Sequence, residues 1–391
     1  MNILQKGMVV LIYSGLTGER MPLPEGFDLE EAYPQLVRHQ VTPLCYVGAV
    51  NCGVDKSLPV MRKLFQSYCR SMQHSEGQMK AVEAVCAAFD AGQVDYMCLK
   101  GSRLKKLYPK PELRLMGDAD ILIRTGQYDR IRPIMLELGF TEKLESNHEL
   151  VWRRKELELE LHKRLIPSYN KDYYRYFGDG WQLAKVKKGT NYEMTREDEY
   201  IYLFTHFAKH YRDGGIGCRH LVDLWVYRKA CPGMDEAYIA GELEKLQLLE
   251  FEQNIRRVTE VWFENVPGDD KTDFITDFLF SSGAWGSAEN HLVSAGVRSA
   301  SDAGSVTKGR IKRVWTAVFP SAEALQNRYP VLRKHPGLLP LIWPVRLVTA
   351  GLFRRNDIRK SCDNLSAATT DKIKTYQDAL HYVGLDFNFR E

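Results

Sequence analysis

The chain has 391 residues, more than one hydrophobic core usually supports, so the sequence predicts several subdomains. Apolar residues make up 44% and charged residues 27%, a balance that is typical of globular proteins and excludes a chain dominated by disorder. The formal net charge is only +4, which excludes an argument for nucleic-acid binding from bulk charge alone.

The cysteines and the apolar segments bear on where the protein works. The eight cysteines form no C-x-x-C pair and no Cys/His cluster with zinc spacing, so we expect reduced thiols. The apolar run over 8–12 is too short for a signal peptide. Prolines interrupt the apolar stretch 338–353, which is shorter than the ~20 residues of a membrane span. We therefore expect a cytoplasmic protein without stable membrane insertion.

The first 92 residues predict a mostly helical N-terminal segment, 1–92. Apolar residues recur near helical spacing over 29–37, 60–72 and 79–89. Gly92 is placed to end the last of these helices.

The segment 93–195 predicts a small mixed sheet covered by helices, and hence an α+β core. The expected elements alternate between strand and helix, in the order 94–99, 101–108, 119–123, 127–138 and 155–162. The last strand alternates strictly: Leu157, Leu159 and Leu161 share one face, and a row of acids ending in His162 shares the other.

The remainder, 196–391, predicts an all-helical C-terminal region. Helical patterns cover 197–210 and 221–229, and further helices are expected beyond Gly233. A stretch rich in Gly, Ser and Ala over 281–305 predicts a linker or mobile loop.

Asp118 and Asp120 are the strongest candidates for chemistry. Side chains at i and i+2 of a strand share a face, so both carboxylates are able to bind one cation. Magnesium uses few protein carboxylates and keeps positions for water and phosphates, so the pair suits a Mg-bound triphosphate. If Glu160 lies on the neighbouring strand, its carboxylate allows a two-metal site with ions ~3.5–4 Å apart.

Gly101 and Ser102 precede this acid pair at the start of a predicted helix. The Ser102 side chain and the backbone N–H groups after Gly101 would face the β- and γ-phosphates, because a helix N-terminus favours anions. A side chain at Gly101 would block the close approach of the phosphates.

The order of these motifs resembles the uncharacterised nucleotidyltransferase family within the polymerase-beta-like superfamily. The resemblance runs over about 30–230 and is specific between 98 and 123. The residues that carry it are Cys98-Leu99-Lys100-Gly101-Ser102, Leu107-Tyr108-Pro109, Leu113-Arg114, Met116 to Ile123, Glu160-Leu161-His162, His206 to His210, Arg219 and Asp223.

The resemblance implies a role for each matching residue. Gly101 and Ser102 would form the nucleotide-binding turn, and Asp118 and Asp120 would be metal ligands. Glu160 would be the third carboxylate, near the acceptor hydroxyl. Relatives in the superfamily often have Asp where this chain has Glu160, and Glu158 on the same face is the alternative.

Four further residues are assigned to nucleotide binding. Lys100 and Arg114 lie inside the matched motif and are candidates to neutralise phosphate charge, with surface cations as the alternative. His206 and His210 are spaced to share a helix face, and without a zincin-type Glu we expect them to line the cleft rather than bind metal. Histidines packed inside the helical region are the alternative.

These observations predict a nucleotidyltransferase that uses Mg²⁺ or Mn²⁺. It would move NMP from a nucleoside triphosphate to an acceptor hydroxyl of a small molecule, a protein or an RNA, and release pyrophosphate. One alternative is a catalytically inactive nucleotide-binding or scaffold protein. Another is an enzyme that modifies RNA or protein, because basic clusters at 308–313 and 354–360 lie near Trp315 and Trp343.

Overall fold

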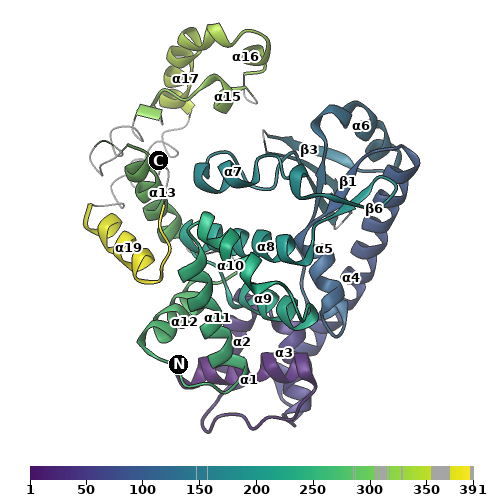
Figure 1. The fold of residues 1–391 in the computed structure, drawn as a ribbon, viewed down its shortest axis with the longest axis vertical. Coiled ribbons are helices and arrows are strands. Elements are labelled where there is room, and N and C mark those ends of the chain that lie inside the picture. Colours follow the sequence, from purple (N-terminus) through teal and green to yellow (C-terminus); the bar gives the residue numbers. More distant parts are fainter. Residues whose placement is uncertain are drawn as a thin grey trace. The chain divides into compact units, whose positions relative to one another are not determined.

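The structure, a computed structural model, is described here for residues 1–146, 148–155, 157–284, 286, 288–303, 308, 315–316, 318–326, 329–353 and 370–387. It divides into two compact units (Figure 1). One comprises Met1–His210 and Ile216–Trp285, and the other comprises Tyr211–Gly215 and Gly286–Glu391. The N-terminal helices, the sheet and several helices of the predicted C-terminal region thus belong to the first unit.

The chain begins with four helices: α1 (Ile3–Thr17), α2 (Leu29–Arg38), α3 (Thr42–Asn51) and α4 (Pro59–Ala91). Asn2 caps α1 in a capping box with Gln5, and the Asp28 side chain accepts backbone N–H groups at the start of α2. The sequence predicted two helices over 60–72 and 79–89, but the structure has the single helix α4. No proline interrupts the residues between them, and Gly77 is tolerated within a helix.

A seven-stranded mixed sheet follows, in the order β3-β4-β5-β2-β1-β7-β6. The strands are β1 (Tyr96–Cys98), β2 (Asp118–Ile123), β3 (Thr141–Glu145), β4 (Glu149–Arg154), β5 (Leu157–His162), β6 (Lys185–Lys188) and β7 (Asn191–Glu193). β2 pairs in parallel with β5 and antiparallel with β1. The predicted α+β fold with a mixed sheet and helical cover is confirmed.

Short helical segments connect the strands. They are α5 (Lys100–Leu104), η1 (Lys105–Leu107), η2 (Pro111–Leu113), η3 (Thr125–Gln127), α6 (Tyr128–Glu137), α7 (Lys171–Phe177) and η4 (Trp181–Leu183). The predicted helix 101–108 is therefore a short α-helix that continues as a 3-10 turn.

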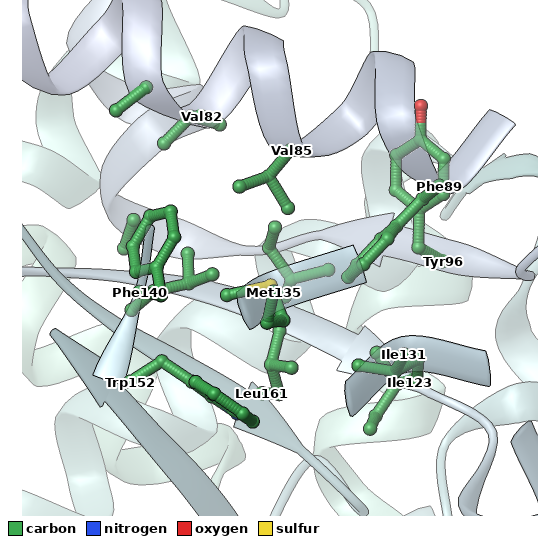
Figure 2. Packing of buried hydrophobic residues seen from close by; sticks show 14 of the residues in the cluster. Val82, Val85, Phe89, Tyr96, Ile123, Ile131, Met135, Phe140, Trp152 and Leu161 are labelled. Atoms are coloured by element: carbon green, nitrogen blue, oxygen red, sulfur yellow. The ribbon is translucent and has the colours of Figure 1, made fainter. Parts of the chain in front are cut away.

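The main core of the sheet lies under α4 and α6. Figure 2 shows Val85 and Phe89 from α4 and Met135 from α6 packed over Trp152 and Leu161 of the sheet. Leu157, Leu159 and Leu161 join this core because the apolar positions of β5 alternate as the sequence predicted. The opposite face of β2 and β5 is thereby left to their polar residues.

Helices complete the rest of the described chain. After the sheet come α8 (Arg196–Arg212), α9 (Cys218–Ala230), α10 (Glu236–Lys245), α11 (Leu249–Phe263) and α12 (Asp270–Ser282), then α13 (Ala288–Ala303), α15 (Ala322–Leu325), α16 (Val331–Lys334), η5 (Pro336–Leu338), α17 (Leu339–Phe353) and α19 (Thr370–Tyr382). Among these residues we find no helix with both the length and the apolar character that crossing a membrane requires.

The structure tests one of two expectations for the C-terminal region, the loop over 281–305, and does not describe most residues of the other, the basic clusters. The predicted loop over 281–305 is largely wrong, because Ala288–Ala303 forms α13. Alanine favours helices, and serine is tolerated in them, so this composition does not by itself specify a loop. The basic residues Arg310, Lys312, Arg313, Arg354, Arg355, Arg359 and Lys360 lie outside the described residues.

Candidate active site on strands β2 and β5

Two parallel strands bring the predicted carboxylates to one face of the sheet. Asp118 and Asp120 lie on β2, and Asp120 is in register with Glu160 on β5. Residues in register on adjacent strands point the same way, and residues i and i+2 share a face. The three acids therefore project away from the core residues Ala119 and Leu159.

Asp120 is held by two cationic or hydrogen-bonding partners. Its Oδ1 accepts hydrogen bonds from Lys100 Nζ at 3.1 Å and from His162 Nε2 at 2.7 Å, and the residue is 4% exposed. Burial would raise the pKa of Asp120, but Lys100 and His162 hold it well below its ordinary value. His162 Nε2 also lies 3.4 Å from Glu160 Oε2, so one imidazole contacts both carboxylates.

Asp118 is in the opposite electrostatic situation. Burial and the charges of Asp120 and Glu160 raise the pKa of Asp118 to about 6, against the opposing charges of Lys100 and Arg219. Three acids thus converge on a face that has too little positive charge for all of them. A bound divalent cation would supply that charge.

Glu158, the alternative third acid, has a partner of its own. It stands in register with Asp118, but its Oε2 accepts a hydrogen bond from Arg153 Nε at 3.1 Å. Glu160 is instead in contact with His162 beside Asp120. The geometry therefore favours Glu160 over Glu158 as the acid that acts together with Asp120.

The predicted nucleotide-binding turn leads into this cluster. The Leu99 N–H donates to the Asp120 carbonyl at 2.9 Å, which ties the turn to β2. Lys100 adopts φ of 35°, a left-handed conformation that is unfavourable for a side chain of its kind, and its ammonium reaches Asp120. Burial would lower the pKa of Lys100, but Asp120, Tyr202 and Asp118 raise it above its ordinary value.

Gly101 and Ser102 are both buried at the start of α5. A Cβ at Gly101 would lie 3.2 Å from the side chain of Met116, so close packing already favours glycine there. Ser102 is 3% exposed, and its Oγ donates to the Leu99 carbonyl at 3.4 Å. The hydroxyl of Ser102 therefore serves the turn itself in this structure.

Arg114 lies in a buried ion pair. Its Nε and Nη2 donate to the two carboxylate oxygens of Asp223 at 2.7 and 2.9 Å, and Tyr108 Oη donates to the same group at 2.8 Å. Burial would raise the pKa of Asp223, but Arg114 and Arg219 lower it below its ordinary value. The pair joins the segment before β2 to α9.

His206 and His210 contact one another on α8. Their Nε2 atoms are 3.1 Å apart, so one ring donates to the other. Burial and the positive charge of Lys100 lower the pKa of His206 well below its ordinary value. The ring of Tyr202, one turn earlier on α8, lies 6.4 Å from that of His206 and 6.0 Å from Lys100 Nζ. α8 therefore brings His206 towards the Lys100 side of the site.

The comparison with known families agrees with this geometry. A family model described as "Uncharacterised nucleotidyltransferase" matches residues 25–264. This stretch is more than half of the chain and contains both strands of the acid cluster. The chain belongs to this nucleotidyltransferase family. Neither the search of curated proteins nor that of solved structures found a match.

Two groups of side chains in the described part of this nucleotidyltransferase have donor atoms suited to a metal. Within each group the ligand atoms lie within 4.8 Å of one another: Asp120, Glu160 and His162 in one, and His148, Glu149 and His162 in the other. Carboxylate oxygens suit Mg²⁺ or Mn²⁺, and imidazole extends the choice to softer transition metals. The donor set therefore fits the expected metal class.

Sequence reasoning did not assign roles to His162, His148 or Glu149. A signal for His162 was present, because the alternation of β5 places it on the face of Glu160. Glu149 lies near His162 because β4 pairs with β5 and places Glu149 opposite His162. The sequence did not predict β4, so it gave no signal for Glu149. His148 Nε2 lies 3.3 Å from His162 Nδ1 and depends on the same pairing.

Proposed function

We propose that the protein is a metal-dependent nucleotidyltransferase of the polymerase-beta type. It would transfer NMP from a nucleoside triphosphate to an acceptor hydroxyl and release pyrophosphate. The observation that carries this proposal is the register of Asp120 with Glu160, with Asp118 on the same face. Mg²⁺ or Mn²⁺ held by these three acids would neutralise phosphate charge and lower the pKa of the acceptor hydroxyl.

Each residue of the cluster has a step that it is placed to perform. The acceptor oxygen forms a bond to the α-phosphorus while the bond from that phosphorus to the bridging oxygen breaks, and the electron pair leaves with pyrophosphate. Glu160 receives the proton of the acceptor hydroxyl, because its carboxylate stands beside Asp120 and His162, whereas Glu158 is paired with Arg153. Lys100 provides a fixed positive charge at Asp120 for the triphosphate.

The other predicted residues are given supporting roles. Backbone N–H groups around Gly101 and Ser102 would approach the phosphates, since the Ser102 hydroxyl is used within the turn. Arg114 would hold the segment before Asp118 through Asp223. His206 and His210 would line the nucleotide or acceptor side of the site, near Tyr202 and Lys100.

The cysteines support a reducing location. The described cysteines are free, and Cys86 Sγ lies 3.5 Å from Cys98 Sγ without a bond between them. Thiols this close together remain reduced in a reducing compartment. We therefore propose that the protein acts in the cytoplasm.

The proposal is tested by incubating the protein with each α-labelled NTP, Mg²⁺ or Mn²⁺, and a cell lysate as the source of acceptor. We expect the label to enter one class of molecule, with pyrophosphate release. Asp118→Asn and Glu160→Gln should lower the rate by at least about 10²–10³-fold. Glu158→Gln is the matched control on the same strand face and should retain activity. Equal rates for the wild type and Asp118→Asn would contradict the proposal.

One observation favours a second candidate, a protein that binds nucleotide without turnover. Asp120 Oδ1 accepts hydrogen bonds from both Lys100 and His162, so a metal at this oxygen would compete with two partners from the chain itself. Under this reading calorimetry would show nucleotide binding, and no acceptor class would take label with either metal. Label transfer that depends on Asp118 would exclude it.

A further inference from the structure

A hollow of about 190 Å³ lies in the first unit, beside the segment that leads into β2. One wall is α4, and the other comes from η1 and the residues before Asp118. Its lining residues are Ser67, Arg70, Ser71, His74, Gln78, Lys105, Leu115 and Met116. None of them belongs to the acid cluster described above.

The α4 wall is a polar face set by the helical repeat. Arg70, His74 and Gln78 are each four residues apart, so they lie above one another along one side of the helix. Gln78 Nε2 donates to the Met116 carbonyl at 2.9 Å, and Ser71 Oγ donates to the Glu112 carbonyl at 2.6 Å. These bonds fix the two walls relative to each other.

Lys105 provides the opposite side of the hollow. The residue is 1% exposed, and within the described part of the chain its ammonium makes no hydrogen bond or ion pair. Burial and the charges of Arg114 and Arg219 lower the pKa of Lys105 to about 8, against the weaker opposing charge of Glu112. It is still protonated at neutral pH. A buried cation that forms no ion pair is costly, and an anion in the hollow is the partner that would relieve the cost.

The chemistry of the lining favours a phosphate group over a single carboxylate. Arg70, His74 and Lys105 offer two permanent or near-permanent positive charges and an imidazole around one space. Guanidinium and ammonium groups together suit the oxygens of a dianion. The volume is below the ~300–1,000 Å³ typical of pockets for drug-sized ligands, so a phosphate on a small molecule fits better than a whole nucleotide.

The hollow adjoins the proposed nucleotide-binding turn through Met116. The Met116 carbonyl is bound by Gln78 on the α4 side, and the Met116 side chain packs against Gly101. Asp118 follows two residues later. We propose that this hollow binds the phosphate group of a small phosphorylated molecule, at a site separate from the one that binds the nucleoside triphosphate.

The test uses the full-length protein without metal or nucleotide, with inorganic phosphate as the probe. Calorimetry and thermal unfolding are measured at constant ionic strength, with chloride replacing phosphate in the control. We expect phosphate to bind the wild type and to raise its Tm. Lys105→Met should weaken this binding at least tenfold, and Arg70→Gln should weaken it several-fold. Lys106→Met is the matched control, because the neighbouring Lys106 is exposed, and it should bind phosphate as the wild type does.

Either of two results with Lys105→Met would overturn the proposal. One is equal phosphate binding by the wild type and a folded Lys105→Met variant. The other is a large loss of affinity for a non-hydrolysable NTP with Mg²⁺ in Lys105→Met, which would assign Lys105 to the phosphates of the nucleotide itself. A parallel titration with glycerol phosphate shows whether an organic phosphate binds as the inorganic ion does. Failure of glycerol phosphate to compete with inorganic phosphate would also contradict the proposal. Because phosphate binding is measured without nucleotide, it fails or succeeds independently of transferase activity.

Discussion

Lys100 and Lys105 lie on consecutive helical segments and are both largely buried, but their surroundings differ. The Lys100 ammonium is 3.1 Å from the Asp120 carboxylate, and its pKa is raised. Lys105 has no such carboxylate within hydrogen-bonding distance in the described structure, and burial lowers its pKa to about 8. Similar side chains, five positions apart, thus have pKa shifts of opposite direction.

The two lysines therefore have opposite effects on the stability of the folded protein. Lys100 is part of a neutralised arrangement in which Asp120 and His162 also take part, so it stabilises the folded site and fixes the acid cluster. Lys105 reduces stability until an anion arrives from outside. The first lysine belongs to the proposed reaction site, and the second belongs to the proposed phosphate site.

The largest effect should come from removing the partner of Lys100. In metal-free protein, Asp120→Asn leaves Lys100 without its carboxylate and His162 with Glu160 alone, and we expect the free energy of unfolding to fall by about 3–5 kcal/mol. Denaturant unfolding at neutral pH measures this. The matched variant is Asp118→Asn, which removes a charge that repels Asp120 and Glu160.

Asp118→Asn should therefore leave the free energy of unfolding unchanged or raise it, although both variants should lose transferase activity. Stability and activity would then separate at two positions of one strand. A similar loss of stability in both variants would contradict the asymmetry between Asp118 and Asp120.

Local patterns predicted the parts of the site that lie on single strands. The alternation of Leu157, Leu159 and Leu161 predicted the core face of β5 and therefore the direction of Glu160, and the spacing of Asp118 and Asp120 predicted a shared face. The sequence did not predict that β2 and β5 are neighbours, and the placement of Glu160 beside Asp120 depended on that pairing. In the structure the two strands pair in parallel, with Asp120 in register with Glu160.

Contacts between distant segments were not predictable in the same way. Arg114 is a candidate to neutralise phosphate charge, and its pairing with Asp223, 109 positions away, has no local signal in the sequence. The position of His148 beside His162 depends on β4, whose short pattern gave no clear period. The hollow at Lys105 requires α4 and η1 to be adjacent, and neither sequence segment specifies that alone.

The next effect concerns Arg114, a buried cation that has a partner as Lys100 does. Arg114→Met should lower the free energy of unfolding by about 3 kcal/mol. This is the lower end of the range for a broken buried ion pair, because Tyr108 still donates a hydrogen bond to Asp223 and the charge of Arg219 still stabilises its carboxylate. Replacing both partners, as Arg114→Met with Asp223→Asn, should recover part of the loss. If Arg114→Met instead keeps its stability and raises the KM for the nucleotide more than tenfold, Arg114 contacts phosphate directly.

The smallest effect should come from Lys105, and its sign should depend on pH. The pKa of Lys105 is about 8 in the folded protein and about 10.5 in the unfolded chain. Between these two pH values, Lys105 carries a proton in the unfolded chain and has lost it in the folded protein. Because the unfolded state binds this extra proton, the free energy of unfolding of the wild type falls as pH falls from about 10.5 to 8. Below pH 8 we expect Lys105→Met to be more stable than the wild type by about 1–3 kcal/mol, and above about pH 10.5 the gap should nearly close.

Denaturant unfolding of both proteins across this pH range measures the gap, with Lys106→Met as the control that should follow the wild type. Parallel stability curves for the wild type and Lys105→Met would show that Lys105 is not destabilised by burial. Adding phosphate gives a further test. An anion that pairs with Lys105 should reduce the difference in free energy of unfolding between Lys105→Met and the wild type at neutral pH. Lys105 would then behave in phosphate as Lys100 does beside Asp120, with the counter-ion coming from solution instead of from the chain.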